Sequence, residues 1–233
     1  MPIPSLAFFI DVDNTLLDND RAKADQAEYL RSLLGETAAS RFWELYEEVR
    51  QEEQVVDYPL TLARFAQAFA GQFSRETLFQ LSSYYLSFPF HTYLYPGALD
   101  TLAYLNALGT TAITSDGDAS FQGLKIVRSG VSAAVEGRVA LYLHKEAHID
   151  EMKALFPAEH YVMIDDKPTI LGAMKMQMAD LLTTVHVRQG KYARQTPAPG
   201  ARPADLSVAA IGAVQQLRRA QFQGLEASAD PCS

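Results

Sequence analysis

Two aspartates two residues apart, Asp11 and Asp13, are the strongest chemical signal in the chain. They stand where an apolar run at residues 6–11 ends, and in an extended chain residues i and i+2 face the same side. Like charges held together raise one another's pKa unless a cation intervenes. A hard ion such as Mg²⁺ would relieve that repulsion. A turn with Asp13 or Asn14 capping a helix explains the pattern equally well.

A second acidic pair, Asp165 and Asp166, closes a later apolar run at residues 160–165. Helix capping explains one of these two aspartates. Two strands that each deliver an acidic pair to the same sheet edge fit an ion site better. We therefore predict a Mg²⁺ site whose ligands come from Asp11, Asp13, Asp165 and Asp166.

Between the acidic pairs lie groups suited to an anion. Ser115 offers a hydroxyl, and the turn at Asp116 and Gly117 offers backbone amides of the kind that hold phosphate. A turn with Asp118 capping the next helix is the commoner explanation of that segment. Lys145 could neutralise both a carboxylate and a phosphoryl oxygen, although most lone lysines are solvated surface residues.

The elements that must position these residues alternate between strand and helix, which predicts a doubly wound α/β fold with a parallel sheet. The expected strands are 6–11, 110–115, 139–143, 160–165 and 181–187. The expected helices between them are 97–108, 118–128, 146–155 and 168–177.

Residues 19–88 differ in character, because their apolar residues recur at helical spacing without a convincing strand. We predict an all-α cap inserted into a core made of residues 1–18 and 89–193. A proline-rich connector begins at residue 194, and the remainder to residue 233 is expected to contain a last helix at 206–220 and a frayed tail.

Composition narrows the class of protein. A length of 233 residues with 48% hydrophobic and 21% charged residues suits a globular enzyme. The net charge of −8 disfavours nucleic acid and anionic membranes as partners. No run reaches transmembrane length, the N-terminal apolar stretch is too short for a signal peptide, and Cys232 is the sole cysteine. These features predict a cytoplasmic protein.

Taken together and in order, the four groups of residues resemble the motifs of the haloacid dehalogenase superfamily. The resemblance covers about residues 6–190. It implies a nucleophilic aspartate at Asp11 and an acid/base aspartate at Asp13. It also implies that Ser115 and Asp116 belong to the phosphate-binding motif, together with Lys145.

The sequence departs from the usual pattern of that superfamily in two respects. Asp116 is acidic where relatives often carry an amide, and positions 170 and 171 hold Ile170 and Leu171 in place of a further aspartate. The ion must then rely on the adjacent pair, in which the resemblance implies Asp166 as direct ligand and Asp165 as helper.

The resemblance implies a Mg²⁺-dependent phosphoric monoester hydrolase that cleaves a small phosphorylated metabolite through an aspartyl-phosphate, as a monomer or homodimer. A phosphomutase, a metal-independent 2-haloacid dehalogenase and a non-catalytic binding protein with the same fold remain alternatives. The cap would determine the substrate specificity. Its basic residues Arg21, Lys23, Arg41 and Arg64 are the candidates for binding a substrate anion.

Overall fold

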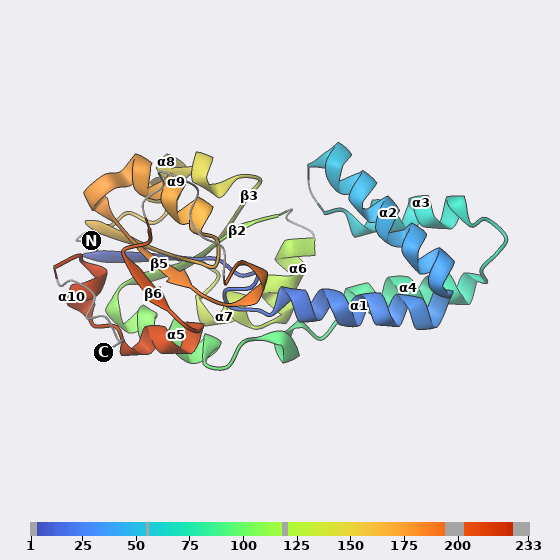
Figure 1. Cartoon of the computed structure of the whole chain (residues 1–233), viewed down its shortest axis with the longest axis horizontal. Helices are drawn as coiled ribbons and strands as arrows, with labels where there is room; N and C mark the ends of the chain where they lie inside the picture. Colours follow the sequence, from blue (N-terminus) through green and yellow to red (C-terminus); the bar gives the residue numbers. More distant parts are fainter. Residues whose placement is uncertain (1–3, 55, 118–120, 194–202, 226–233) are drawn as a thin grey trace.

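The computed structural model describes residues 4–54, 56–117, 121–193 and 203–225 (Figure 1). Within them, one parallel sheet has the strand order β3-β2-β1-β4-β5-β6. The strands are β1 (Leu6–Ile10), β2 (Thr110–Asp116), β3 (Val139–Tyr142), β4 (His160–Asp165), β5 (Leu182–Val187) and β6 (Leu206–Val208). The doubly wound α/β fold predicted from the sequence is confirmed. The chain order runs outward on both sides of β1, so the strand order reverses between β1 and β4, where such sheets bind ligands.

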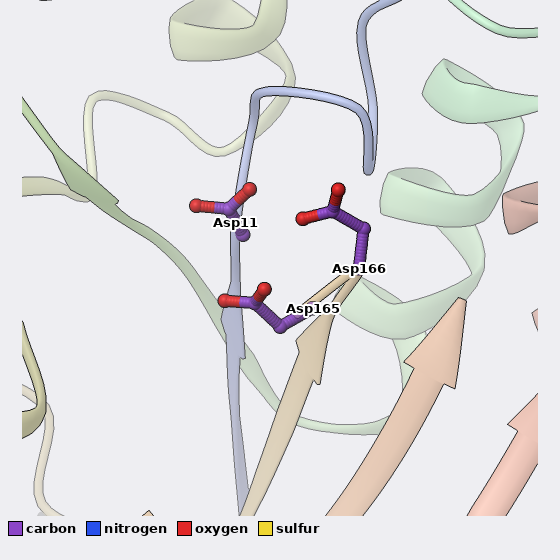
Figure 2. Close-up of side chains that lie close together, drawn as sticks. All are labelled: Asp11, Asp165 and Asp166. Atoms are coloured by element: carbon purple, nitrogen blue, oxygen red, sulfur yellow. The ribbon is translucent and has the colours of Figure 1, made fainter. Parts of the chain in front are cut away.

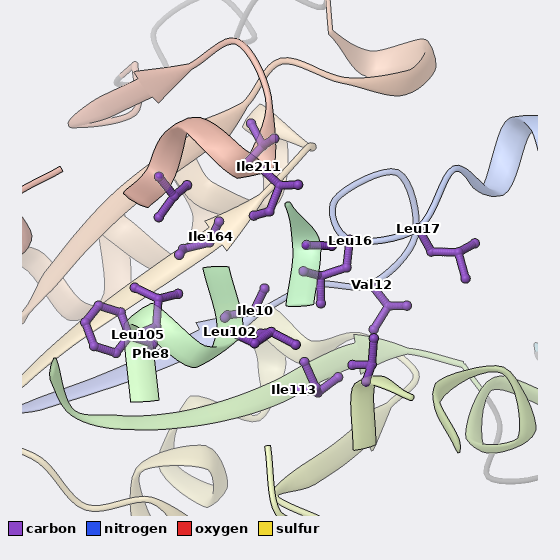
Figure 3. Close-up of a cluster of buried hydrophobic side chains, with 14 of the residues drawn as sticks. Phe8, Ile10, Val12, Leu16, Leu17, Leu102, Leu105, Ile113, Ile164 and Ile211 are labelled. Atoms are coloured by element: carbon purple, nitrogen blue, oxygen red, sulfur yellow. The ribbon is translucent and has the colours of Figure 1, made fainter. Parts of the chain in front are cut away.

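β1 is the central strand because every one of its residues is apolar and fully buried. Its side chains alternate between two cores. Leu6, Phe8 and Ile10 join the core that contains Leu102 and Leu105 of α5 (Ala98–Leu108), which Figure 3 shows. Ala7 and Phe9 join the opposite core, with residues of α8 (Ile149–Leu155) and α9 (Pro168–Met178). Helices on both faces explain why the strand reads as a continuous apolar run.

The helices of this α/β part follow the strands in turn. The α-helices are α5 (Ala98–Leu108), α6 (Phe121–Arg128), α7 (Val131–Ala134), α8 (Ile149–Leu155) and α9 (Pro168–Met178). Short 3-10 segments complete it: η2 (Lys145–Ala147), η3 (Ala179–Leu181) and η4 (Gly190–Tyr192). The predicted helix 118–128 is described from Phe121 onward, and its first residues lie outside the described ranges.

Four helices occupy the segment between β1 and α5: α1 (Asn19–Leu34), α2 (Glu36–Glu53), α3 (Tyr58–Ala68) and α4 (Arg75–Ser87). Asp18, Asp57 and Ser74 cap three of them with side-chain oxygens. The helices share an apolar cluster of their own around Phe42 and Phe65. Figure 1 shows them extending away from the sheet, and η1 (Phe90–Tyr93) leads the chain back. That residues 19–88 act as a separate cap stays a prediction.

The prediction of a helix at 206–220 is wrong. Residues Leu206 and Val208 are buried while Ser207 is exposed, and this alternation forms β6, which pairs with β5. The chain then continues as η5 (Ile211–Gln216) and α10 (Arg219–Phe222). An edge strand of three residues is too short for its alternation of buried and exposed residues to be distinguished from a helical pattern in the sequence alone. Connector residues 194–202 and tail residues 226–233 lie outside the described residues. No helix of the described part combines the length and hydropathy needed to span a membrane.

Candidate active site

Three buried carboxylates meet where β1 and β4 end (Figure 2). Asp11 directly follows β1, Asp165 is the last residue of β4, and Asp166 comes next. The Asp11 amide donates to the Ile164 carbonyl at 3.0 Å, which carries the pairing of the two strands one residue further. One oxygen from each carboxylate lies within 4.8 Å of the others. At this spacing the three groups can share one divalent cation.

Lys145 is the first residue of η2, three residues after the end of β3, and its side chain reaches into this cluster. Its Nζ is 2.6 Å from Asp11 Oδ1 and 2.6 Å from Asp165 Oδ2, and it donates to the Thr114 carbonyl at 3.2 Å. The side chain has no exposed surface. Burial lowers the pKa of Lys145, but the charges of Asp11 and Asp165 outweigh burial and raise it. The lysine therefore stays a cation inside the site.

The positive charges of Lys145 and Lys167 do not neutralise all three carboxylates of the cluster. Burial raises the pKa of Asp11 to about 6, against the opposing charges of Lys145 and Lys167. The pKa of Asp166 is raised to about 9, mainly by burial and to a lesser extent by the negative charges of Asp11 and Asp165. Within the described part of the chain, neither Asp166 oxygen has a hydrogen-bond partner. A buried carboxylate without partners is costly, and carboxylate oxygens are what Mg²⁺ prefers. These residues fit the ion that the sequence predicted.

Thr15 joins two of the three aspartates, a role that no feature of the sequence reveals. Its hydroxyl donates to Asp11 Oδ2 at 3.3 Å and accepts from the Asp166 amide at 3.0 Å. The turn that brings it there forms because the amides of Leu16 and Leu17 both donate to the Val12 carbonyl, at 2.9 Å each. One buried hydroxyl thus fixes the end of β1 relative to the end of β4.

The same turn depends on Asn14 and Gly190. Asn14 has a φ of 61°, and its side-chain oxygen accepts from the amides of Asn19 and Asp20 at the start of α1. Gly190 of η4 lies directly against it. A Cβ added to Gly190 would lie 2.6 Å from the Cβ of Asn14, and its φ of +60° is also one that glycine tolerates best. Glycine is therefore required where this segment contacts the turn.

The Asp13 carboxylate contacts Lys125 and is not part of the cluster formed by Asp11, Asp165 and Asp166. Lys125 of α6 donates to both carboxylate oxygens, at 2.7 and 2.9 Å, and to Asn19 Oδ1 at 3.1 Å. The Lys125 side chain is only 5% exposed. The predicted metal set included Asp13, but its carboxylate lies outside the three-carboxylate cluster of the described residues. No feature of the sequence distinguishes Lys125, because a lysine on a helix is ordinarily solvated.

Comparison with known proteins identifies the family. The family model for haloacid dehalogenase-like hydrolases matches residues 6–176, which include the three aspartates of the cluster, Lys145, Thr15, Asp13 and Lys125. The chain belongs to this family. A haloacid dehalogenase-like hydrolase from Burkholderia xenovorans LB400 is 41% identical, with a TM-score of 0.81 over 93% of this chain and 98% of that one. No curated protein matches the chain.

More distant solved structures share the fold of this haloacid dehalogenase-like hydrolase. The L-2-haloacid dehalogenase of Xanthobacter autotrophicus is 20% identical, with a TM-score of 0.55 over 90% of this chain and 96% of that one. A hydrolase of the family from Bacillus subtilis, bound to magnesium, is 14% identical, with a TM-score of 0.57 over 91% and 97%. At these identities the likeness shows the fold alone.

The predicted phosphate-binding segment of the hydrolase lies at the end of β2. Ser115 is buried, and its hydroxyl accepts from Gln122 Nε2 at 3.0 Å. Asp116 Oδ1 accepts from the backbone amide of Lys145 at 2.9 Å, so this acidic residue positions the loop that carries the lysine. The Gly117 amide donates to the Tyr142 carbonyl at 2.8 Å and is engaged there, contrary to the expectation that it faces a phosphate. Asp118 lies outside the described residues.

The missing aspartate of the last motif also has a structural explanation. Ile170 and Leu171 are both buried in the apolar core on the α9 side of the sheet. A carboxylate at either position would be placed in that apolar core, where burying its charge is costly. The carboxylates of this hydrolase that can hold an ion are therefore, among the described residues, those of Asp11, Asp165 and Asp166.

Proposed function

We propose that this hydrolase is a Mg²⁺-dependent phosphatase that cleaves a small phosphorylated metabolite through an aspartyl-phosphate on Asp11. The observation that carries the proposal is Asp166, a buried carboxylate whose two oxygens have no hydrogen-bond partner within the described residues, beside Asp11 and Asp165. A phosphate ester is itself anionic, so a carboxylate can attack it only where positive charge is concentrated. Lys145 supplies part of that charge.

Asp11, Asp166 and the backbone carbonyl of Asp13 are the groups that would hold the ion. Asp165 suits the helper role better, because one of its oxygens pairs with Lys145 and the other accepts from the Lys167 amide at 2.8 Å. When bound, Mg²⁺ would reduce the repulsion between the Asp11 carboxylate and the phosphoryl oxygens.

In the first half-reaction, an oxygen of Asp11 attacks phosphorus and the bond to the ester oxygen breaks. Lys145 is placed to hold phosphoryl oxygens during attack, since its ammonium already contacts Asp11. Asp13, in its protonated form, gives its proton to the departing alkoxide and is left as the carboxylate. Ser115, at the end of the neighbouring strand β2, is the further residue expected to bind a phosphoryl oxygen.

In the second half-reaction, the Asp13 carboxylate takes a proton from water, and the resulting hydroxide attacks the phosphorus of phospho-Asp11. The bond between phosphorus and the Asp11 oxygen breaks, which releases inorganic phosphate and restores the carboxylate. Thr15, which donates to Asp11 Oδ2, holds the nucleophile in one orientation through both steps.

A metal-independent 2-haloacid dehalogenase is the nearest alternative. It would use Asp11 as nucleophile but needs neither an acid two residues later nor a pair of aspartates beside the nucleophile. The ion pair at Asp13 and the unpartnered Asp166 would then have no purpose, which favours the phosphatase. A phosphomutase shares every residue and is separated from the phosphatase by its product. A non-catalytic binding protein is disfavoured because the whole set of motif residues is present.

The testing experiment is a panel of phosphorylated metabolites assayed with Mg²⁺ and with EDTA, with inorganic phosphate as the readout. We expect phosphate release that requires Mg²⁺ and disappears in Asp11→Asn. A parallel assay of chloride release from 2-chloropropionate tests the dehalogenase. Chloride release that persists in EDTA, without phosphate release from any ester, would overturn the proposal. Transfer of phosphate to a second position of the substrate, without its release, would identify a mutase.

The remaining predictions follow from the same proposal. The partner is a small phosphorylated molecule, the protein acts as a monomer or homodimer in the cytoplasm, and helices α1–α4 close over the site as a cap. The cap is joined to the core close to Asp18 and again near Phe90, so those two connections are the expected hinges.

A further inference from the structure

A small cavity of about 90 Å³ separates the catalytic edge of the sheet from the helices α1–α3. Asp13, Asp116 and Lys125 line it on the core side, and Lys23, Gln26 and Tyr58 line it on the cap side. Drug-sized ligands occupy pockets of roughly 300–1,000 Å³. Because the cavity begins at Asp13, it is the space into which a leaving group protonated by Asp13 would extend.

The four basic cap residues differ sharply in where they lie. Arg41 pairs with Glu44 and Glu48 at 3.0 and 2.7 Å, on an exposed face. Arg64 pairs with Glu52 at 2.6 Å, and it is likewise away from the cavity.

Arg21 donates to the Thr92 carbonyl at 2.9 Å and lies over the ring of Tyr93, so it is engaged where the chain returns from the cap. Lys23 is the member of this set that lines the cavity. Its ammonium lies 5.6 Å from the centre of the Tyr46 ring, another cavity residue.

The two lysines of the cavity are in different electrostatic states. Lys125 is neutralised by Asp13, which contacts it through both oxygens. Lys23 has no ion-pair partner among the residues that the structure describes. Partial desolvation and the nearby charge of Lys125 lower the pKa of Lys23. An anionic group in the cavity would offset both effects, because it would face two ammonium groups and one carboxylate at that end.

We propose that the substrate's leaving group is short and carries a carboxylate, which Lys23 binds across the cavity from Asp13. The inference rests on the proposed phosphatase function and names the substrate class of that same site. A carboxylate suits the small volume better than a second phosphate does. Asp116, the other acidic wall residue, is held by the Lys145 amide at the core edge and so lies on the phosphate side of the site.

The test compares three esters of nearly equal size: 2-carboxyethyl phosphate, its neutral amide 2-carbamoylethyl phosphate, and the cationic 3-aminopropyl phosphate. We expect the carboxylate ester to have the highest kcat/KM, mainly through a lower KM. A hydrogen-bonded contact between charges is strong enough to make this preference roughly 10- to 100-fold over the amide. The aminopropyl ester should be the poorest substrate.

Three variants assign the preference to one side chain. Lys23→Met should lower kcat/KM for the carboxylate ester much more than for the amide ester, and so remove the preference for the carboxylate. Lys23→Arg should keep much of it. Arg31→Met is the matched control, because Arg31 is an exposed basic residue of the same helix that does not line the cavity. It should behave as the wild type with all three esters.

The outcomes separate this inference from the function on which it rests. Equal cleavage of the carboxylate and amide esters by the wild type would overturn the inference and leave the phosphatase standing. An equal loss of kcat/KM on the carboxylate and amide esters in Lys23→Met would also overturn the inference, because it would indicate a structural role for Lys23. Failure of the wild type to release phosphate from any ester with Mg²⁺, including p-nitrophenyl phosphate, would overturn the phosphatase itself.

Discussion

The Lys125 ammonium contacts both carboxylate oxygens of Asp13, at 2.7 and 2.9 Å, and thereby fixes the direction in which the proposed acid/base points. The contact joins α6, after the second strand, to the turn after the first. Lys125 touches no reacting atom in the mechanism proposed above, so its expected role is to position Asp13.

Replacing Lys125 by methionine should slow alkyl phosphate turnover by roughly 10- to 100-fold, because misplacing a reacting group by about 1 Å has an effect of that size. An aryl phosphate should be affected less, since its leaving group hardly needs the proton. Steady-state kcat values on the two ester types measure the difference. Lys125→Arg should recover part of the activity. Equal kcat losses on both ester types would argue against a role through Asp13.

Asp13→Asn tests the acid/base role directly. The change keeps size but removes both the proton for the alkoxide and the base for water, so alkyl phosphate turnover should fall about 10²–10⁴-fold. With an activated aryl phosphate the second half-reaction becomes limiting, and phospho-Asp11 should accumulate. Intact mass after a rapid quench detects the added phosphate. Full activity of the variant on an alkyl phosphate would remove Asp13 from the acid/base role.

The stability of the metal-free protein should fall as pH rises. Asp11 and Asp166 have folded-state pKa values near 6 and 9, above the ordinary value of 3.8. A carboxyl whose pKa is raised on folding contributes stability below its unfolded pKa and loses that contribution as pH rises through the folded value. The loss of stability therefore extends from about pH 4 to about pH 9. Urea midpoints in EDTA at several pH values check this, and a midpoint that rises between pH 5 and 8 would contradict it.

Asp166→Asn should separate metal binding from folding. In the metal-free wild type at pH 8, folding must hold the Asp166 carboxyl protonated, because its folded-state pKa is about 9, and this costs stability; the asparagine has no such cost, so the metal-free variant should be at least as stable as the wild type. Added Mg²⁺ should raise the melting temperature of the wild type but not that of the variant. Asp180→Asn, at an exposed aspartate outside the site, is the control and should retain the Mg²⁺ response. A full response in Asp166→Asn would remove this residue from the metal set.

Gly190→Ala should destabilise the protein and impair catalysis together. The new methyl group would lie 2.6 Å from Asn14 Cβ, in the turn that carries Asp11 and Thr15. Gly71→Ala is the matched control, because Gly71 also has a positive φ, of +78°, but has nothing within 4 Å of its would-be Cβ. The control should cost about 1 kcal/mol in the free energy of unfolding, and Gly190→Ala clearly more. Chemical denaturation and kcat measure the two effects, and equal losses in both variants would show that the contact with Asn14 is unimportant.

The sequence by itself determined the α/β class and the positions of the strands β1 to β5 along the chain. The run at β1 is apolar without alternation, and this pattern arises when both faces of a strand are covered. It also placed Asp11, Asp165 and Asp166 at strand ends, and parallel strands bring those ends to one edge. Such features are local in the chain and therefore readable from it. The short strand β6 was missed because its alternation spans three residues.

Only the tertiary structure decided which partner each charged side chain has. Lys125 and Asp13 are 112 residues apart, and Thr15 and Asp166 are 151 apart, so no spacing in the sequence relates them. Whether a lysine is solvated, paired or directed at a cavity depends on which surfaces pack around it. The sequence therefore does not distinguish Lys23 from Arg21, Arg41 and Arg64 as a substrate-binding residue, and only the packing of the helices against the core shows which of them lines the cavity.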